Sequence, residues 1–118
     1  MSATDHTENA LTELRRALAS YFAVSVADVR PLLSSLLLSL EAEITILKKY
    51  EYHQEEPNFS FARDSIMMVA KRLKSKFLQE MCDHLNNSAS AKELNANIEA
   101  FLRCVQEMRA LHAKSRTR

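Results

Sequence analysis

The stretch PLLSSLLLSLEAEITIL, residues 31–47, decides the fold, because no other segment of the chain is so apolar. At about 100° per residue its large apolar residues fall in one broad stripe, the signature of a helix that faces a core. This stripe comprises Leu33, Leu36, Leu37, Leu40, Ile44 and Leu47. A second stripe of mostly small residues, on roughly the far side of the helix, comprises Ser35, Ser39, Ala42 and Ile46. Small residues let another helix approach closely, so we place this helix at the centre of a bundle, with neighbours on both faces. One of those neighbours could belong to another chain.

The composition favours helices over sheets. The 118 residues include no glycine and only two prolines, which removes the residues that supply tight hairpin turns. The hydrophobic share of 47% and the charged share of 26%, of both signs, are those of an ordinary globular protein. The length suits a single domain. We therefore expect one all-α domain over residues 1–118.

Periodicity and capping residues predict four amphipathic helices. The core side of the first helix is marked by Leu11, Leu14, Leu18, Tyr21 and Phe22. A short extra helical turn near residues 25–30 precedes the second helix, and Pro57 lies in the loop before the third. Ser90 and Glu93 match the S-x-x-E capping box at the start of the fourth. The expected helices, and a basic frayed tail after them, cover residues 5–24, 28–52, 60–86, 90–113 and 114–118.

Short connections between helices of this length predict an antiparallel up-down-up-down four-helix bundle. The competing architecture is a helical hairpin that completes its core only as a dimer, which the second stripe of residues 31–47 would permit. Both architectures are all-α.

Charge and targeting signals point to no special compartment or partner. The net charge is +1, although residues 1–57 hold five basic and nine acidic residues and residues 58–118 hold eleven and six. The N-terminus has no secretory pattern, and the longest apolar run falls well short of the ~20 residues of a membrane span. We expect a cytoplasmic protein with no membrane span.

The sequence lacks the residues that catalysis would need. It has no glycine-rich phosphate loop, no G-x-S-x-G and no H-E-x-x-H. Glu80 and His84 are four residues apart but lack the second pair that a bundle metal site uses. Cys82 and Cys104 lack CxxC spacing, so we expect free thiols. We expect no enzyme activity, no cofactor, no metal and no small-molecule substrate.

Excess apolar helix surface favours a protein-interaction module, such as an adaptor, regulator, chaperone or assembly subunit. The partner could be another protein or a second copy, as in a homodimer. The expected interface lies on the second and third predicted helices and comprises Ser35, Leu38, Ser39, Ala42, Ile46, Leu78, Cys82 and Leu85.

The alternative is a nucleic-acid-binding regulator that uses basic residues of the third and fourth predicted helices. These residues are Lys71, Arg72, Lys74, Lys76, Arg109, Lys114, Arg116 and Arg118. We favour a solvated surface for them, because acidic residues interrupt any continuous basic stripe and the cations of the third helix spread over more than half its circumference.

Overall fold

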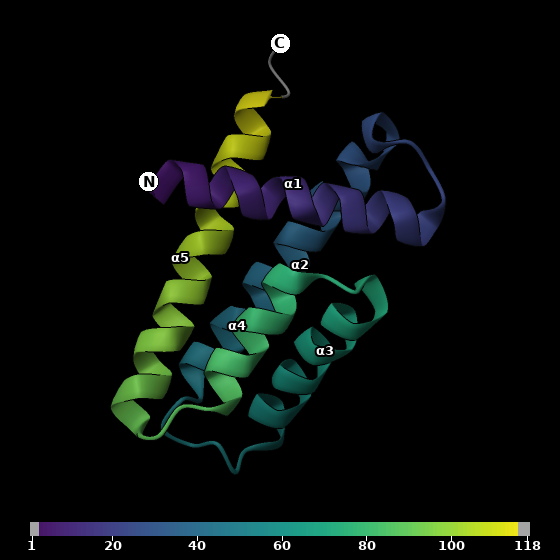
Figure 1. Ribbon diagram of the computed structural model, residues 1–118. Coiled ribbons are helices and arrows are strands. Elements are labelled where there is room, and N and C mark those ends of the chain that lie inside the picture. Colours follow the sequence, from purple (N-terminus) through teal and green to yellow (C-terminus); the bar gives the residue numbers. More distant parts are fainter. Residues whose placement is uncertain (1–2, 116–118) are drawn as a thin grey trace.

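The computed structural model describes residues 3–115, which form five α-helices and one 3₁₀ turn and no strand (Figure 1). The elements in chain order are α1 (Ala3–Phe22), η1 (Val26–Val29), α2 (Arg30–Lys49), α3 (Pro57–Leu73), α4 (Lys76–Asn86) and α5 (Ala91–Ser115). The all-α class is confirmed. The extra turn expected near residues 25–30 is η1, capped by the Ser25 hydroxyl, which accepts from the Asp28 amide.

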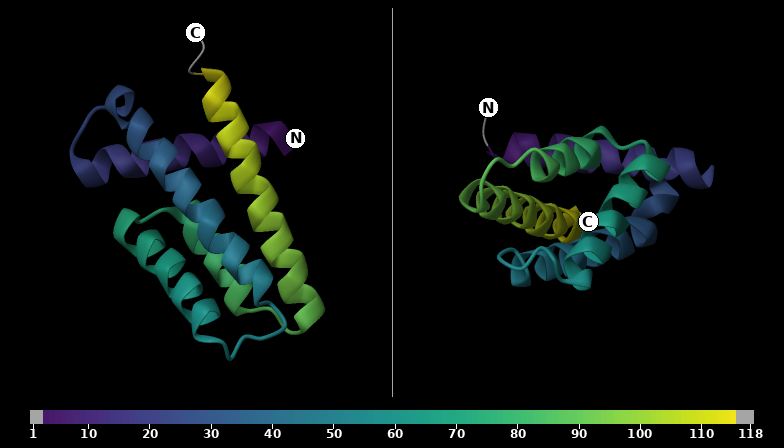
Figure 2. Two further views of the ribbon diagram at one scale, coloured as in Figure 1. Left: turned by 180° about the vertical axis from the view of Figure 1, so that it is seen from behind. Right: turned by 90° about the horizontal axis from the view of Figure 1, so that it is seen from below.

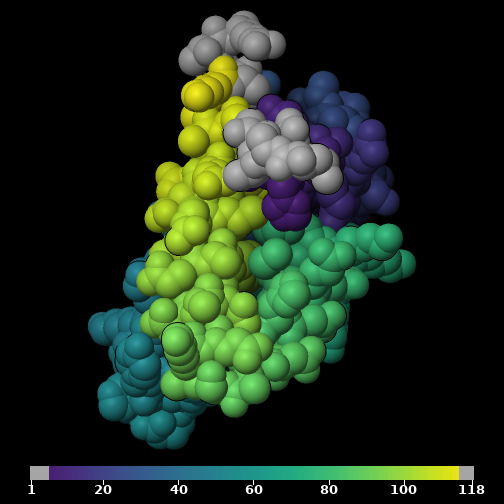
Figure 3. Space-filling model, turned by 60° about the vertical axis from the view of Figure 1, so that its left-hand side comes forward, coloured from purple at the N-terminus to yellow at the C-terminus, as the bar shows by residue number. Residues whose placement is uncertain are grey.

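Four of the helices form a ring, and α1 lies across one end of it. Helices α2, α3, α4 and α5 alternate in direction, and each packs against the next, with α5 returning to α2 (Figures 1 and 2). Figure 3 shows the flank where α4 and α5 lie side by side, with α1 above α4 and beside the upper part of α5. The chain bends by 100° between α1 and the η1–α2 segment. The predicted four-helix bundle is therefore not confirmed, because its first helix crosses the others instead of running alongside them.

The core is built around α2, as the apolar stripe predicts. The residues of α2 that are at most 2% exposed are Leu33, Leu37, Leu40, Ile44 and Leu47. The facing residues of α5, all fully buried, are Ile98, Phe101, Val105 and Met108. Full burial of one such side chain stabilises the fold by about 1.5–3 kcal/mol. Leu36 lies at the edge of the stripe and is only partly buried.

The single third helix predicted over residues 60–86 is wrong, because the chain breaks there into α3 and α4. The Ser75 hydroxyl caps α4 by accepting from the Leu78 amide at 3.2 Å. The same hydroxyl donates to Glu13 of α1 at 2.7 Å, and the Phe77 amide donates to that carboxylate at 2.8 Å. The cap that separates the two helices is therefore completed by a residue more than sixty positions away in the sequence.

Two helices end in left-handed residues that are not glycine. Ala23 (φ 54°) follows α1, where the Val24 amide donates to the Ala19 carbonyl at 3.0 Å. Lys74 (φ 55°) ends α3 with the same arrangement of backbone bonds. This is the Schellman motif, which usually places glycine at the left-handed position. A chain without glycine accepts some strain at both places.

The remaining helix starts follow local sequence rules. Pro57 is the first residue of α3, so this helix begins three residues earlier than predicted, because proline fits the first helical turn. One half of the predicted capping box of α5 is present, because the Glu93 amide donates to the Ser90 hydroxyl at 3.1 Å. The Glu93 carboxylate in turn accepts from the Ala89 amide at 3.2 Å.

Candidate binding surface

The outward face of α2 is exposed, as the predicted interface requires. Leu38 is 57% exposed, and Ser35, Ser39 and Ala42 are exposed beside it. Ile46 is half-buried against the core. This part of the predicted surface is available in the folded monomer.

The other part of the predicted interface is not available. Leu78, Cys82 and Leu85 belong to α4 and are buried. Because the chain reverses at the break after α3, α4 packs its apolar face against α3 and α5. The Phe77 and Phe101 rings, for example, meet edge to face with centroids 6.2 Å apart. The expectation that these three residues lie on a partner surface is wrong.

An apolar groove lies between the end of α1, the first half of α2 and the end of α3. It is a hollow of about 410 Å³. Its large apolar walls include Tyr21, Phe22, Leu32, Leu36 and Val69. The small residues Ser35 and Ser39 of the predicted stripe also line it, and Arg72 is its one charged lining residue. We call this hollow the apolar groove.

Exposed aromatic side chains mark the α1 edge of the groove. Tyr21 is 51% exposed and Phe22 is 47% exposed, and their rings meet edge to face at 4.9 Å between centroids. The turn to η1 adds the exposed side chains of Val24 and Val26. The last turn of α1 therefore presents large apolar groups to solvent. Periodicity alone assigns Tyr21 and Phe22 to the core side, and the signal it leaves unused is the break that follows them at once.

A second, basic hollow of about 590 Å³ adjoins the groove and shares Tyr21, Arg72 and Leu73 with it. Four cations line it: Arg16 of α1, Arg72 of α3, Lys74 at the end of α3 and Lys76 at the start of α4. Its acidic residue is Glu13, whose carboxylate already accepts the two hydrogen bonds that cap α4. We call this region the basic hollow.

The predicted nucleic-acid contacts do not all gather in this hollow. Lys71 is exposed on α3. Arg109 lies on α5 and forms an ion pair with Glu41 of α2, and Lys114 is exposed near the end of α5. Helix α1 crosses between the α3–α4 junction and the end of α5 (Figures 1 and 2). The basic residues of α3 and α4 therefore do not merge with those of α5 in the described part of the chain. The predicted contacts Arg116 and Arg118 lie outside that part.

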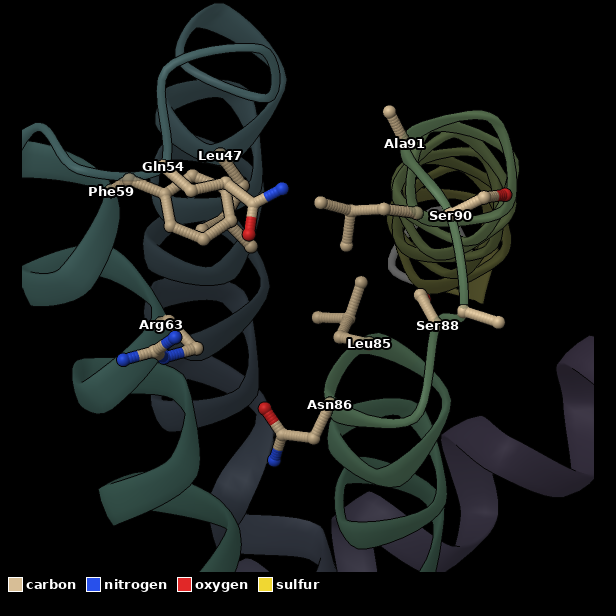
Figure 4. Close-up of a pocket in the computed structure, with 11 residues that line it drawn as sticks. Leu47, Gln54, Phe59, Arg63, Leu85, Asn86, Ser88, Ser90 and Ala91 are labelled. Atoms are coloured by element: carbon tan, nitrogen blue, oxygen red, sulfur yellow. The ribbon is translucent and has the colours of Figure 1, made fainter.

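A third hollow, of about 340 Å³, lies at the opposite end of the ring. It opens between the α2–α3 loop and the α4–α5 loop, and Figure 4 shows Gln54 and Leu85 pointing into it from different sides. Its charged lining residue is Arg63. The residues that line this hollow offer hydrogen bonds but no nucleophile paired with a base, which covalent catalysis would need.

The remaining candidates for chemistry are occupied or unreactive. His112 is buried, and its Nε2 lies 2.9 Å from the Ser34 hydroxyl and 3.2 Å from the Arg30 carbonyl. Burial raises the pKa of both Cys82 and Cys104 to about 11, with a smaller contribution from a neighbouring carboxylate in each case. Thiols with such a pKa are poor nucleophiles near neutral pH.

No single helix in residues 3–115 is long and apolar enough to span a membrane, and α1 with η1–α2 meets that test only as a pair bent by 100°. The same residues hold no group of three or more His, Cys, Asp or Glu side chains that could bind a metal ion.

Comparison of the chain with protein-family models, with curated proteins and with solved structures found no match.

Proposed function

We propose that this protein is a non-enzymatic interaction module that holds a helical segment of a partner protein in the apolar groove. The observation that supports this proposal is one hollow lined by two exposed aromatic side chains, Tyr21 and Phe22, and by the half-buried side chains of Leu32, Leu36 and Val69. Scattered exposed apolar residues are ordinary on protein surfaces, but a contiguous concave group of them is typical of binding sites.

The free energy available at the groove is sizeable. Tyr and Phe side chains bury about 150–250 Å² each, so covering the exposed half of one ring removes roughly 100 Å² from water. At about 25 cal/mol per Å² this contributes about 2.5 kcal/mol per ring. Two rings with their aliphatic neighbours can therefore offset much of the roughly 4–15 kcal/mol cost of association.

The shape of the groove suits a helix. Residues of α1, α2 and α3 form its walls, and the small side chains of Ser35 and Ser39 leave room for a backbone to approach. Amphipathic helices commonly bind in such grooves through apolar residues at i, i+3, i+4 and i+7. The predicted small-residue stripe of α2 thus contributes to the proposed site, together with the end of α1.

Site-specific photo-crosslinking in cells that produce the protein tests the proposal. A photoreactive amino acid at Ser39, inside the groove, should yield one dominant protein adduct, identified by mass spectrometry. The same group at Thr45, which is exposed on α2 but outside the groove, should not. An adduct of twice the chain mass would make the partner a second copy. Equal adducts at both positions, or none at Ser39, would contradict the proposal.

A nucleic-acid-binding regulator is the second candidate, because the basic hollow gathers four cations. Its support is weaker, since α1 separates this hollow from the predicted contacts on α5. If all four cations met phosphates, affinity for duplex DNA would fall on the order of 100-fold between 50 and 200 mM salt. A titration at these two concentrations, with Arg72→Glu as the variant, decides the matter. No measurable binding at the lower salt concentration would remove this candidate.

A further inference from the structure

We infer that the partner segment is an acidic amphipathic helix, with its apolar face in the apolar groove and its carboxylates against the basic hollow. This inference rests on the proposed function and adds the chemistry of the partner. Its basis is the continuity of the two hollows, which share Tyr21, Arg72 and Leu73. A ligand that fills the first therefore reaches the cations of the second.

The four cations of the basic hollow have no carboxylate partner within the described chain. Arg16, Arg72, Lys74 and Lys76 take part in none of the ion pairs that the described residues form. Glu13 lies among them, but its carboxylate accepts from the Ser75 hydroxyl and the Phe77 amide. Glu13 offsets one of the four positive charges, and the positive charge that remains in the hollow is left for an anion from outside.

Some cations elsewhere on the surface are matched by acidic residues. Lys48 of α2 pairs with Glu99 of α5, and Arg109 of α5 pairs with Glu41 of α2. These pairs join the two central helices of the ring. The basic hollow differs from them because three helices bring cations to one place without bringing an available acid.

Helix stability explains only some of these cations. Arg72 lies in the last turn of α3, where a positive charge interacts favourably with the helix dipole. Lys76 is the first residue of α4, where a positive charge is unfavourable, and no acidic residue lies in that first turn. Lys76 therefore weakens the start of its own helix, and an anionic ligand in the hollow would remove that effect.

The shape and the charge together favour a peptide over a membrane or a nucleic acid. The apolar surface is concave, whereas a lipid surface is met best by apolar groups that protrude. A nucleic-acid duplex keeps the flat faces of its bases inside the stack, so it has no apolar face to fill a groove lined by Phe22, Leu32 and Val69. An amphipathic helix supplies both components, because its apolar stripe and flanking charged positions lie side by side on one surface.

A displayed library of helical peptides tests the inference with defined probes. The apolar positions i, i+3, i+4 and i+7 are fixed as Leu, Ile or Met, and the flanking positions are randomised among Asp, Glu, Lys, Arg, Ser and Gln. Selection on the natural protein is followed by removal of peptides that also bind Ser39→Trp, which fills the groove. We expect Asp and Glu to dominate the flanking positions of the peptides that remain.

Fluorescence anisotropy of the most enriched peptide then measures the charge contribution. Arg72→Glu should weaken binding by about tenfold or more, and a peptide with Lys in place of its Glu residues should bind this variant better than the natural protein. Lys92→Glu makes the same charge change on the first turn of α5, at the other end of the ring, and should leave affinity unchanged. Circular dichroism checks that each variant is folded.

The outcomes separate this inference from the function beneath it. Enriched peptides with neutral or basic flanks, or equal affinity for Arg72→Glu, would overturn the acidic partner and leave the groove as a binding site. A selection that yields no peptide preferring the natural protein over Ser39→Trp would overturn the proposed function itself. Arg72-dependent binding to phosphatidylserine vesicles or a DNA duplex, with no peptide enriched, would replace the peptide with that ligand.

Discussion

Replacing Glu13 with alanine should destabilise the protein strongly, although this residue is only half-buried on α1. Its carboxylate accepts from the Ser75 hydroxyl at 2.7 Å and from the Phe77 amide at 2.8 Å. Ser75 is fully buried, and its hydroxyl oxygen also accepts from the Leu78 amide. One carboxylate thus holds the first turn of α4 and docks it on α1.

The cost follows from the bonds that the substitution removes. A hydrogen bond to a charged group contributes about 1.5–3 kcal/mol. A carboxylate at a helix N-terminus gains a further ~0.3–1 kcal/mol from the helix dipole. Glu13→Ala loses both bonds and leaves the Ser75 hydroxyl without this acceptor, although water can reach part of the site. We expect a loss of about 2–4 kcal/mol in the free energy of unfolding.

Equilibrium urea unfolding followed by circular dichroism measures the change, with Glu13→Gln, Ser75→Ala and the double variant completing the set. Glu13→Gln keeps an acceptor oxygen and should lose about half as much as Glu13→Ala. Ser75→Ala should cost about 1–2 kcal/mol as a lost N-cap. The double-mutant cycle should give a coupling energy of about 1–2 kcal/mol between the two residues, because they share one hydrogen bond.

Glu8→Ala is the matched control, since Glu8 is an exposed carboxylate on the same helix and should change stability by less than about 0.5 kcal/mol. For a domain of this size 1 kcal/mol corresponds to about 4 °C in Tm, so the two alanine variants should differ by about 10 °C. Additive effects within about 0.3 kcal/mol would refute the shared bond. A loss for Glu13→Ala no larger than that of Glu8→Ala would refute the capping role.

Three further predictions follow from single features of the structure. Ala23→Gly should stabilise the fold by about 0.5–1 kcal/mol, because the backbone of Ala23 is left-handed. Ala110→Gly within α5 should instead cost about 1 kcal/mol in the same urea experiment. Burial raises the pKa of both cysteine thiols to about 11. They should therefore react with a thiol reagent at pH 7 roughly 100-fold more slowly than in the unfolded chain. Equal rates would contradict their burial. Leu37→Ala should cost about 3 kcal/mol because the side chain is fully buried, whereas Leu38→Ala, one residue on and 57% exposed, should change stability by less than about 0.5 kcal/mol in urea unfolding.

Much of the core could be predicted from the sequence, because helical periodicity records which side of a helix is buried. Five of the six residues of the α2 stripe, Leu33, Leu37, Leu40, Ile44 and Leu47, are buried as expected. The Ser90 hydroxyl caps α5, as the local sequence predicts. These features depend on residues within a turn or two of each other.

The break between α3 and α4 could not be predicted by the same means. Periodicity continues across it, and Ser75 alone is a weak stop signal in a chain that lacks glycine. What fixes the break is a carboxylate from α1 that completes the cap. A single helix over residues 60–86 would leave Leu78 and Leu85 on an outer surface, whereas the break turns them into the core.

The apolar groove has a related cause, which lies in the crossing of α1 and not in the pattern of any one helix. Periodicity places Tyr21 and Phe22 on the buried side of α1, and Leu18, one turn earlier, is indeed only 4% exposed. The 100° bend after α1 carries its last turn past the helices that would otherwise cover it. The Glu13 carboxylate fixes α1 to the start of α4 from one side, and η1 fixes it to α2 from the other. The same two attachments therefore hold the aromatic edge of the groove in place and set the basic hollow beside it, so loss of the Glu13 cap should weaken peptide binding in the groove as well as stability.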